Sequence, residues 1–337
     1  MRGTPEEIEG LTPDRFVAEI QPAYRPVILR GLAKDWPAVR AARESNEAVA
    51  RYVSGFDQGR TTEAFLGTAE MAGRFFYGSD IAAFNFRREA ARISEVLGFL
   101  VSDGVRADAP SVYIGATAVP DYLPGFERSN PMSLLAGKPA VPRIWIGNRS
   151  TIAAHFDISD NIACVVAGRR RFTLFPPEQV ANLYVGPLDH TMAGQPASMV
   201  DLANPDFERF PRFREALGAA LVAELEPGDA IYIPPLWWHH VQTLAPFNIL
   251  LNYWWEEQSA DAGSPFEAMV HAILSVSRLP GPQRQAWSRM FDHYVFRPTG
   301  EDPAAHLPES GRGILAEPTP QLRIRIRQFL MRVLGAR

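Results

Sequence analysis

The chain has 337 residues, of which 46% are hydrophobic and 21% are charged, so it can bury one large core or one core plus an appendage. Its net charge of -4 argues against a general nucleic-acid binder, since such proteins usually carry a basic surplus. The single cysteine, Cys164, excludes an internal disulfide framework and predicts a small buried residue. No apolar run is long enough to span a membrane and no secretory signal is recognisable, so we expect a cytoplasmic protein without a membrane partner.

Before residue 110 the pattern predicts an N-terminal α/β elaboration built of short elements. Thr12 and Pro13 stand where an N-cap and a first helical turn belong, so a short helix is expected over 12–20. The other predictions for this part are a strand over 26–29, a helix over 38–53, strands over 62–67 and 74–77, and an amphipathic helix over 93–101.

From residue 111 onward β-prone runs predominate. A strand is expected over 111–115, and the Pro- and Gly-rich stretch 115–141 is expected to form a loop over the functional site, where loops commonly select the substrate. A long insertion over 185–224 carries His190. We interpret His190 as structural or solvent-exposed, because nothing in the sequence pairs it with another reactive group.

The last part of the chain, 260–337, changes to a helical pattern and is expected to follow a catalytic domain that spans 1–259. Ser264 has the character of an N-cap before the first helix. A second helix is expected over 282–295, a linker over 297–320, and a basic amphipathic helix at the end. Such a helix can lie on a membrane surface, but the segment is short, which favours simple packing.

A candidate metal site lies in the segment 151–177. His155 and Asp157 are two residues apart, and in an extended strand such residues point to the same face, so an imidazole and a carboxylate project together. An H-x-D pair alone is more often a surface hydrogen bond than a metal site. A third ligand from elsewhere in the chain is therefore needed to support the prediction.

The segment 226–243 supplies that ligand. A turn that contains Gly228 leads into a β-prone run, and Pro234 is followed five residues later by His239. His239 and His240 face opposite ways in a strand, so only one of them can ligate, and the spacing selects His239. We interpret His240 as a hydrogen-bond donor behind the ligands or a packing residue. Two histidines and one carboxylate with open positions form the facial triad of non-haem Fe(II) oxygenases.

These motifs resemble the JmjC-like cupin family of Fe(II)/2-oxoglutarate dioxygenases, and within it the asparaginyl hydroxylases that act on hypoxia-inducible factor. The resemblance is carried by HFD with Asn161, GRRRFTLFPPEQVANLY (168–184), VDLANPDFERFPRF (200–213), EPGDAIYIPPLWWHHV (226–241), LNYWW (251–255) and, more weakly, RPVILRGLAKDWPA (25–38). It covers residues 12–257. It implies a mainly β fold, a double-stranded β-helix or jelly-roll barrel with its core at 110–257, followed by C-terminal helices.

The resemblance also implies the cofactors and their ligands. Fe(II) would be held by His155, Asp157 and His239, and 2-oxoglutarate and O₂ would be co-substrates. Five residues match positions that line the family's co-substrate pocket: Tyr113, Asn161, Arg170, Asn252 and Trp254. Without the resemblance, the aromatic residues among them would be interpreted as ordinary core packing.

Two positions depart from the asparaginyl hydroxylases. Arg170 stands where they have the lysine that pairs with the distal carboxylate of 2-oxoglutarate, and a guanidinium can bind that carboxylate with two parallel hydrogen bonds. The alternative is that Arg170 belongs to a solvated turn of three arginines. Ile152 replaces a co-substrate-binding threonine, and the adjacent Thr151 would face the opposite side of a regular strand.

The implied reaction hydroxylates a protein or peptide side chain and releases succinate and CO₂, and no side chain beyond the metal ligands is assigned a catalytic role. The alternatives are a small-molecule 2-oxoglutarate oxygenase, a cupin isomerase with a zinc-like metal, and a binding or sensing module without turnover. An open groove would favour a polypeptide substrate, and a closed pocket with convergent polar groups would favour a metabolite. The resemblance further implies a homodimer formed through the C-terminal helices.

Overall fold

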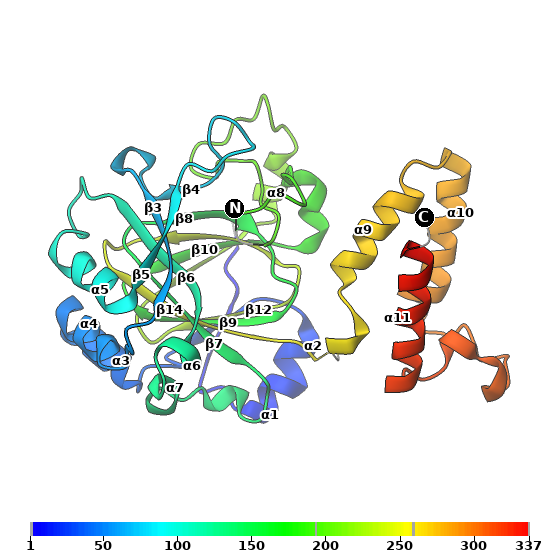
Figure 1. The fold of residues 1–337 in the computed structure, drawn as a ribbon, viewed down its shortest axis with the longest axis horizontal. Helices are drawn as coiled ribbons and strands as arrows, with labels where there is room; N and C mark the ends of the chain where they lie inside the picture. Colours follow the sequence, from blue (N-terminus) through cyan, green and yellow to red (C-terminus); the bar gives the residue numbers. More distant parts are fainter. Residues whose placement is uncertain (1–2, 193, 258–259, 336–337) are drawn as a thin grey trace. The chain divides into compact units, whose positions relative to one another are not determined.

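Strands dominate the first of the two units into which the chain divides, Met1–Glu256 and Glu257–Arg337. The computed structural model describes residues 3–192, 194–257 and 260–335. In the first unit the described strands form two sheets (Figure 1).

The larger sheet has the strand order β1-β2-β12-β9-β14-β7-β6-β3-β5, and the smaller has the order β11-β10-β13-β8-β4. The strands are β1 (Glu6–Glu9), β2 (Val27–Arg30), β3 (Thr61–Gly67), β4 (Arg74–Phe75), β5 (Arg87–Arg92), β6 (Ser111–Ala118), β7 (Val141–Gly147), β8 (Thr151–His155), β9 (Asp160–Ala167), β10 (Arg170–Phe175), β11 (Leu221–Leu225), β12 (Ala230–Ile233), β13 (Trp238–Thr243) and β14 (Asn248–Trp255). Antiparallel neighbours that are distant in sequence, such as β9 with β14 and β10 with β13, are typical of a jelly roll. The predicted mainly β, jelly-roll fold is confirmed.

The strand β9 shows how the layers stack, because all of its residues are buried. Ala163 and Val165 face the smaller sheet and pack with Phe172 of β10. Ile162 and Cys164 alternate with them and face a second core on the other side of the larger sheet. Cys164 is therefore the buried residue that its apolar neighbours predicted.

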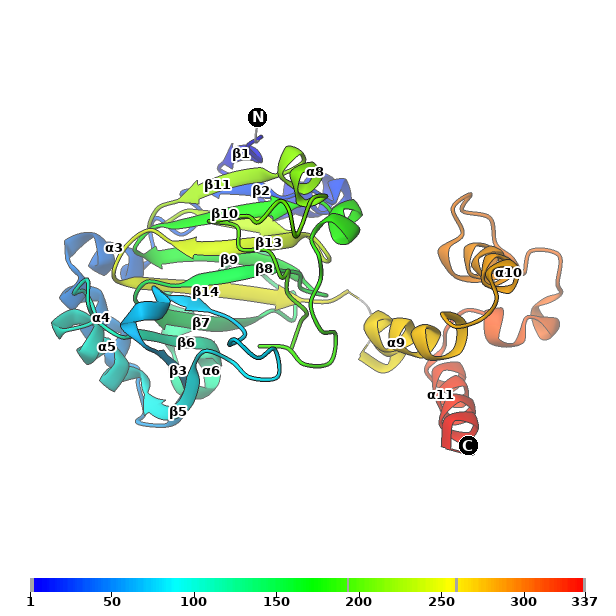
Figure 2. The same cartoon turned by 90° about the horizontal axis from the view of Figure 1, so that it is seen from above.

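The second core is covered by N-terminal helices. The helices α3 (Pro37–Glu44), α4 (Asn46–Ser54) and α5 (Ile93–Ser102) contribute to this core, and they lie together on one side of the sheets (Figure 2). The single helix expected over 38–53 is in fact two, because Ser45 adopts an extended backbone and its side chain caps α4 by accepting from the N–H of Ala48. The shorter helices are α1 (Pro13–Arg15), α2 (Gln21–Ala23), α6 (Val119–Tyr122), α7 (Phe126–Ser129) and α8 (Phe213–Gly218).

The stretch 115–141 does not form the expected loop over the functional site. It contains the end of β6 and the helices α6 and α7, and it buries Leu123 and Leu134 in the same core as the N-terminal helices. The prediction is wrong beyond Ala116, because the apolar side chains of this stretch are buried on the far side of the larger sheet.

The second unit is helical, with α9 (Pro265–Val276), α10 (Gly281–Phe291) and α11 (Pro320–Gly335). Ser264 caps α9 as predicted, because its hydroxyl accepts from the N–H of Phe266. Leu322 is the one large apolar side chain that is buried among the described residues of this unit. In the parts of the chain that the structure describes, the helices are too short or too polar to cross a bilayer.

Candidate metal centre and its cavity

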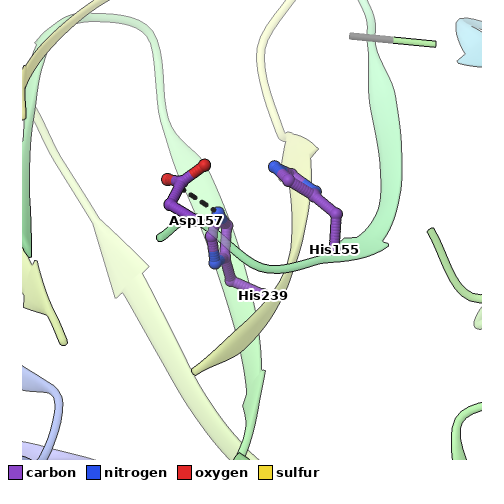
Figure 3. A group of neighbouring side chains, drawn as sticks. All are labelled: His155, Asp157 and His239. Atoms are coloured by element: carbon purple, nitrogen blue, oxygen red, sulfur yellow. Dashed lines mark ion pairs between the residues drawn. The ribbon is translucent and has the colours of Figure 1, made fainter. Parts of the chain in front are cut away.

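The candidate ligands meet where two neighbouring strands of the smaller sheet end. His155 is the last residue of β8 and lies directly opposite His239 of β13, so their rings are 4.3 Å apart between centroids. Asp157 lies just past the end of β8, and its Oδ2 is 3.7 Å from Nε2 of His239. One ligand atom from each residue lies within 4.8 Å of the others (Figure 3). The structure thus brings together the three residues that the sequence selected.

Both imidazoles are held in the tautomer that a metal requires. Nδ1 of His155 lies 2.9 Å from the carbonyl oxygen of Ala153, and Nδ1 of His239 lies 3.0 Å from that of Trp237. Because a carbonyl can only accept, each Nδ1 carries the hydrogen and each Nε2 keeps its lone pair for a metal.

Burial keeps His239 neutral. The side chain is almost wholly inaccessible to solvent, and this burial, with the neighbouring His155, lowers the pKa of His239 to about 4. The nearby carboxylate of Asp157 opposes the shift but does not cancel it. His239 is therefore unprotonated near neutral pH, which is the state that can ligate a metal.

Three of the residues predicted to bind the co-substrate form a hydrogen-bonded chain that ends on Asp157. Asn161 Nδ2 and Trp254 Nε1 both donate to Asp157 Oδ2, at 3.0 and 3.1 Å. Asn252 Nδ2 in turn donates to Asn161 Oδ1 at 2.6 Å. These bonds fix the plane of the ligand carboxylate. A direct contact of the three residues with 2-oxoglutarate stays a prediction.

A cavity of about 530 Å³ opens onto the three candidate ligands. The residues predicted for the co-substrate all line it: Tyr113, Asn161, Arg170, Asn252 and Trp254. Ile152 lines it as well, whereas Thr151 does not, as the alternation of strand residues predicts. Apart from these groups the walls are largely apolar, with aromatic rings among them, which limits the water that can enter.

Arg170 is not part of a solvated turn. Its neighbours Arg169 and Arg171 point outward and pair with Glu224, whereas Arg170 is only 3% exposed. Among the described residues its guanidinium has no hydrogen-bond or ion-pair partner, and its Nε is buried and unsatisfied. Burial lowers the pKa of Arg170 to about 10, so the group is still charged at neutral pH. An unpaired buried cation calls for an anion in the cavity.

Two segments that are distant in sequence meet over the cavity, and we call the residues that cover it the roof. Tyr77 donates from its hydroxyl to the carbonyl of His190 at 2.6 Å, and Arg88 donates to the carbonyl of Met192 at 2.8 Å. The ring of His190 stacks on Phe84 at 4.8 Å, so its interpretation as a structural residue holds. These contacts place the insertion loop beside the segment around β4 and β5 (Figure 2).

Several cavity residues had no signal in the sequence. Glu63, Phe65, Phe75, Phe86, Arg88, Thr191 and Gln195 all line the cavity, and none was a candidate. Phe65 is the most informative of them, because β3 pairs it with Tyr113 and with Arg88 in one row across three strands. That row could be inferred from sequence only if the pairing of β3, β5 and β6 were known.

A model of the cupin-like domain matches residues 13–261, most of the chain. The chain belongs to this cupin-like family. The match confirms the predicted resemblance to the JmjC-like cupins, which are Fe/2-oxoglutarate-type oxygenases, and the His-Asp-His geometry fits Fe(II) binding.

Curated relatives of this cupin-like protein differ in the share of their length that the chain covers. It is 25% identical over 255 residues to Jumonji C domain-containing protein 5 of Drosophila melanogaster, spanning 59% of that protein and using 74% of this chain. It is also 25% identical over 320 residues to tRNA wybutosine-synthesizing protein 5 of Gallus gallus, with 91% of that protein and 84% of this chain covered. Human HSPB1-associated protein 1 is 31% identical over 148 residues, which are 30% of its length and 43% of this chain.

Proposed function

We propose that this chain is an Fe(II)- and 2-oxoglutarate-dependent oxygenase that hydroxylates a side chain of a protein or peptide. Iron bound by His155, Asp157 and His239, together with 2-oxoglutarate and O₂, would supply the oxidising chemistry. One oxygen atom of O₂ goes to the substrate C–H as hydroxyl, and the other goes to 2-oxoglutarate, which leaves as succinate and CO₂.

The observation that carries this proposal is the buried guanidinium of Arg170 in the cavity of the candidate ligands. Its charge has no anionic partner among the described residues, so a dianion such as 2-oxoglutarate would satisfy it with two parallel hydrogen bonds. Burial raises the pKa of the Tyr113 hydroxyl, and this group therefore stays protonated and can donate to the same carboxylate. The arginine-for-lysine replacement is thus compatible with co-substrate binding.

The other residues hold and shield the reactants. The chain of Asn252, Asn161 and Trp254 keeps the Asp157 carboxylate in one orientation. The largely apolar walls exclude water, which protects a reactive oxidant from side reactions. None of these roles requires a side chain to transfer a proton.

A small-molecule substrate is the second candidate. The cavity volume of about 530 Å³ falls within the range of about 300–1,000 Å³ that is usual for small-ligand sites, and a roof partly covers it. A module that binds 2-oxoglutarate without turnover is a weaker alternative, because all three candidate ligands are present and oriented.

Anaerobic titration of the metal-free protein with Fe(II) and 2-oxoglutarate tests the proposal. We expect a metal-to-ligand charge-transfer band in the wild type, its loss in His155→Ala and a weaker band in Arg170→Glu. The first variant removes a metal ligand and the second places a negative charge where the co-substrate carboxylate would lie. Iron binding by the wild type without a band would show that 2-oxoglutarate is not the co-substrate.

We also propose that the helical unit forms a homodimer. Large apolar side chains are exposed along all three of its long helices, among them Leu274 of α9, Met290 of α10 and Met331 of α11. Exposed apolar patches of this kind mark interaction surfaces. We expect light scattering to give a dimer for the full chain and a monomer for residues 1–256. A dimer of the truncated chain would place the interface elsewhere.

A further inference from the structure

A second, outer hollow adjoins the metal cavity and shares two residues with it. This hollow, of about 330 Å³, is lined by residues of β3 and β5 and by Tyr122. Glu63 and Arg88 line both spaces. A ligand that occupies both spaces therefore contacts a carboxylate and a guanidinium.

The guanidinium of Arg88 is held in place. It lies 5.1 Å from the ring centroid of Phe65, and 6.0 and 5.9 Å from those of Phe84 and Phe86. One of its nitrogens donates to the Met192 carbonyl. Such contacts fix the direction in which the remaining N–H groups point. Arg88 is therefore a preorganised donor and not a freely moving surface side chain.

Glu63 and Arg88 form an ion pair across β3 and β5 but no hydrogen bond. Their nearest atoms are 3.5 Å apart, longer than a usual N–H···O bond, and the Glu63 carboxylate accepts no hydrogen bond from the described residues. Both side chains are near half exposed, at 50% and 41%. A ligand can bind to both without first breaking a hydrogen bond between them.

The row of paired residues leads from this pair to the co-substrate region. Arg88 pairs with Phe65, and Phe65 pairs with Tyr113, which lies beside Arg170. Two strand spacings separate Arg88 from Tyr113, or about 10 Å between Cα atoms. Between them the wall is apolar, formed by Phe65 with Phe75 and Phe86.

We infer that Glu63 and Arg88 are specificity-determining residues that hold the main chain of an amino-acid unit whose apolar side chain extends along this wall towards the metal. The inference rests on the proposed function and names its substrate class. The unit offers an N–H to Glu63 and a carbonyl oxygen to Arg88, one on each side of its Cα. A charged side chain would lose its hydration against the phenyl rings without gaining a partner.

The unit can come from a polypeptide or from a free amino acid, because both present an N–H donor and an oxygen acceptor on either side of the Cα, as amides in the first and as an ammonium and a carboxylate in the second. The outer hollow continues past the pair, over Thr61 and Ala90, and so has room for the residues that flank the unit in a polypeptide. The pair itself is neutral overall, so it gives a polyanion such as RNA no electrostatic advantage.

The test uses calorimetric titration of the full chain with peptides Ac-Gly-Gly-X-Gly-Gly-amide and with the free amino acids X, where X is Leu, Phe, Trp, Asp or Lys. Titrations are run up to millimolar concentrations, anaerobically with Fe(II) and 2-oxoglutarate and again without both. We expect the probes with apolar X to bind, and we expect Glu63→Gln and Arg88→Gln each to weaken their affinity about tenfold or more. The control is Arg87→Gln, because Arg87 is next to Arg88 but pairs with Glu89 and lies outside both hollows. This variant should keep the affinity within about twofold of the wild type.

Glu63→Gln keeps the test decisive, because it leaves Arg88 and its hydrogen bond to the Met192 carbonyl in place. Binding of peptides but not free amino acids identifies a polypeptide source, and the reverse identifies a free amino acid. Binding that both variants leave unchanged, preference for Asp or Lys, or no binding by any probe overturns the inference. If the charge-transfer band is missing but apolar probes bind and the variants weaken them, the proposed function fails while the recognition stands.

Discussion

Arg170→Met is expected to stabilise the ligand-free protein and at the same time abolish its response to 2-oxoglutarate. Arg170 is buried beside Tyr113 without an anionic partner among the described residues, and burial lowers its pKa to about 10. At neutral pH the group is protonated in both the folded and the unfolded chain, so the folded state carries the full cost of the buried charge. Methionine has a similar length and no charge, and we expect it to raise the free energy of unfolding by about 1–4 kcal/mol.

Urea unfolding of both proteins, with and without 2-oxoglutarate and Fe(II), measures the two effects together. The wild type should gain about 2.7 kcal/mol when the co-substrate is present at a hundred times its dissociation constant, whereas Arg170→Met should gain nothing from it. Arg171→Met is the matched control, because Arg171 lies on the same strand but is partly exposed and pairs with Glu224, so its loss should cost about 0–1 kcal/mol. A less stable Arg170→Met protein would mean that the guanidinium is already satisfied without a ligand.

The metal ligands could be predicted from the sequence because each depends on local rules. His155 and Asp157 lie close together through their separation by one residue, and the turn at Gly228 with Pro234 sets where β13 begins and so which histidine faces inward. The inward direction of Arg170 likewise follows from alternation after the hairpin turn. In one detail the structure differs from the expected extended strand, because β8 ends at His155 and Asp157 lies beyond it.

The walls and roof of the cavity could not be predicted in this way, because they depend on contacts between distant segments. The sequence does not predict the strand β5, because five of its six residues are exposed and four are charged, so no apolar alternation marks it. Arg88 lines the cavity only because β5 pairs with β3, and Met192 reaches the site only because Arg88 and Tyr77 hold the insertion loop. The expected loop over 115–141 is wrong because its Pro and Gly content predicts irregular structure, whereas the stretch forms short helices and buries leucines in the core.

His239→Ala and His240→Ala are expected to have very different effects on iron binding, although the two residues are adjacent and both buried. His239 lies opposite His155 and within reach of Asp157, whereas His240 points to the other face of β13, away from the cavity. Loss of a group that only orients a ligand costs about 10–100-fold in metal affinity, so loss of the ligand itself should cost about 100-fold or more. His240→Ala should keep Fe(II) affinity within about tenfold of the wild type.

Anaerobic Fe(II) titration against a competing chelator gives both affinities, and urea unfolding of the metal-free variants separates metal binding from folding. Each substitution removes a buried side chain, so both variants should lose stability. If the two variants differ more in Fe(II) affinity than in the free energy of unfolding, the variant with the lower affinity has lost a metal ligand. If His239→Ala keeps iron and His240→Ala loses it, the register of β13 differs by one residue from the one described. That register also pairs Leu174 with His239 and so fixes which side chains of β10 face the cavity, Arg170 included. The assignment of the metal ligand and that of the co-substrate cation therefore depend on the same strand register, and this pair of variants tests both.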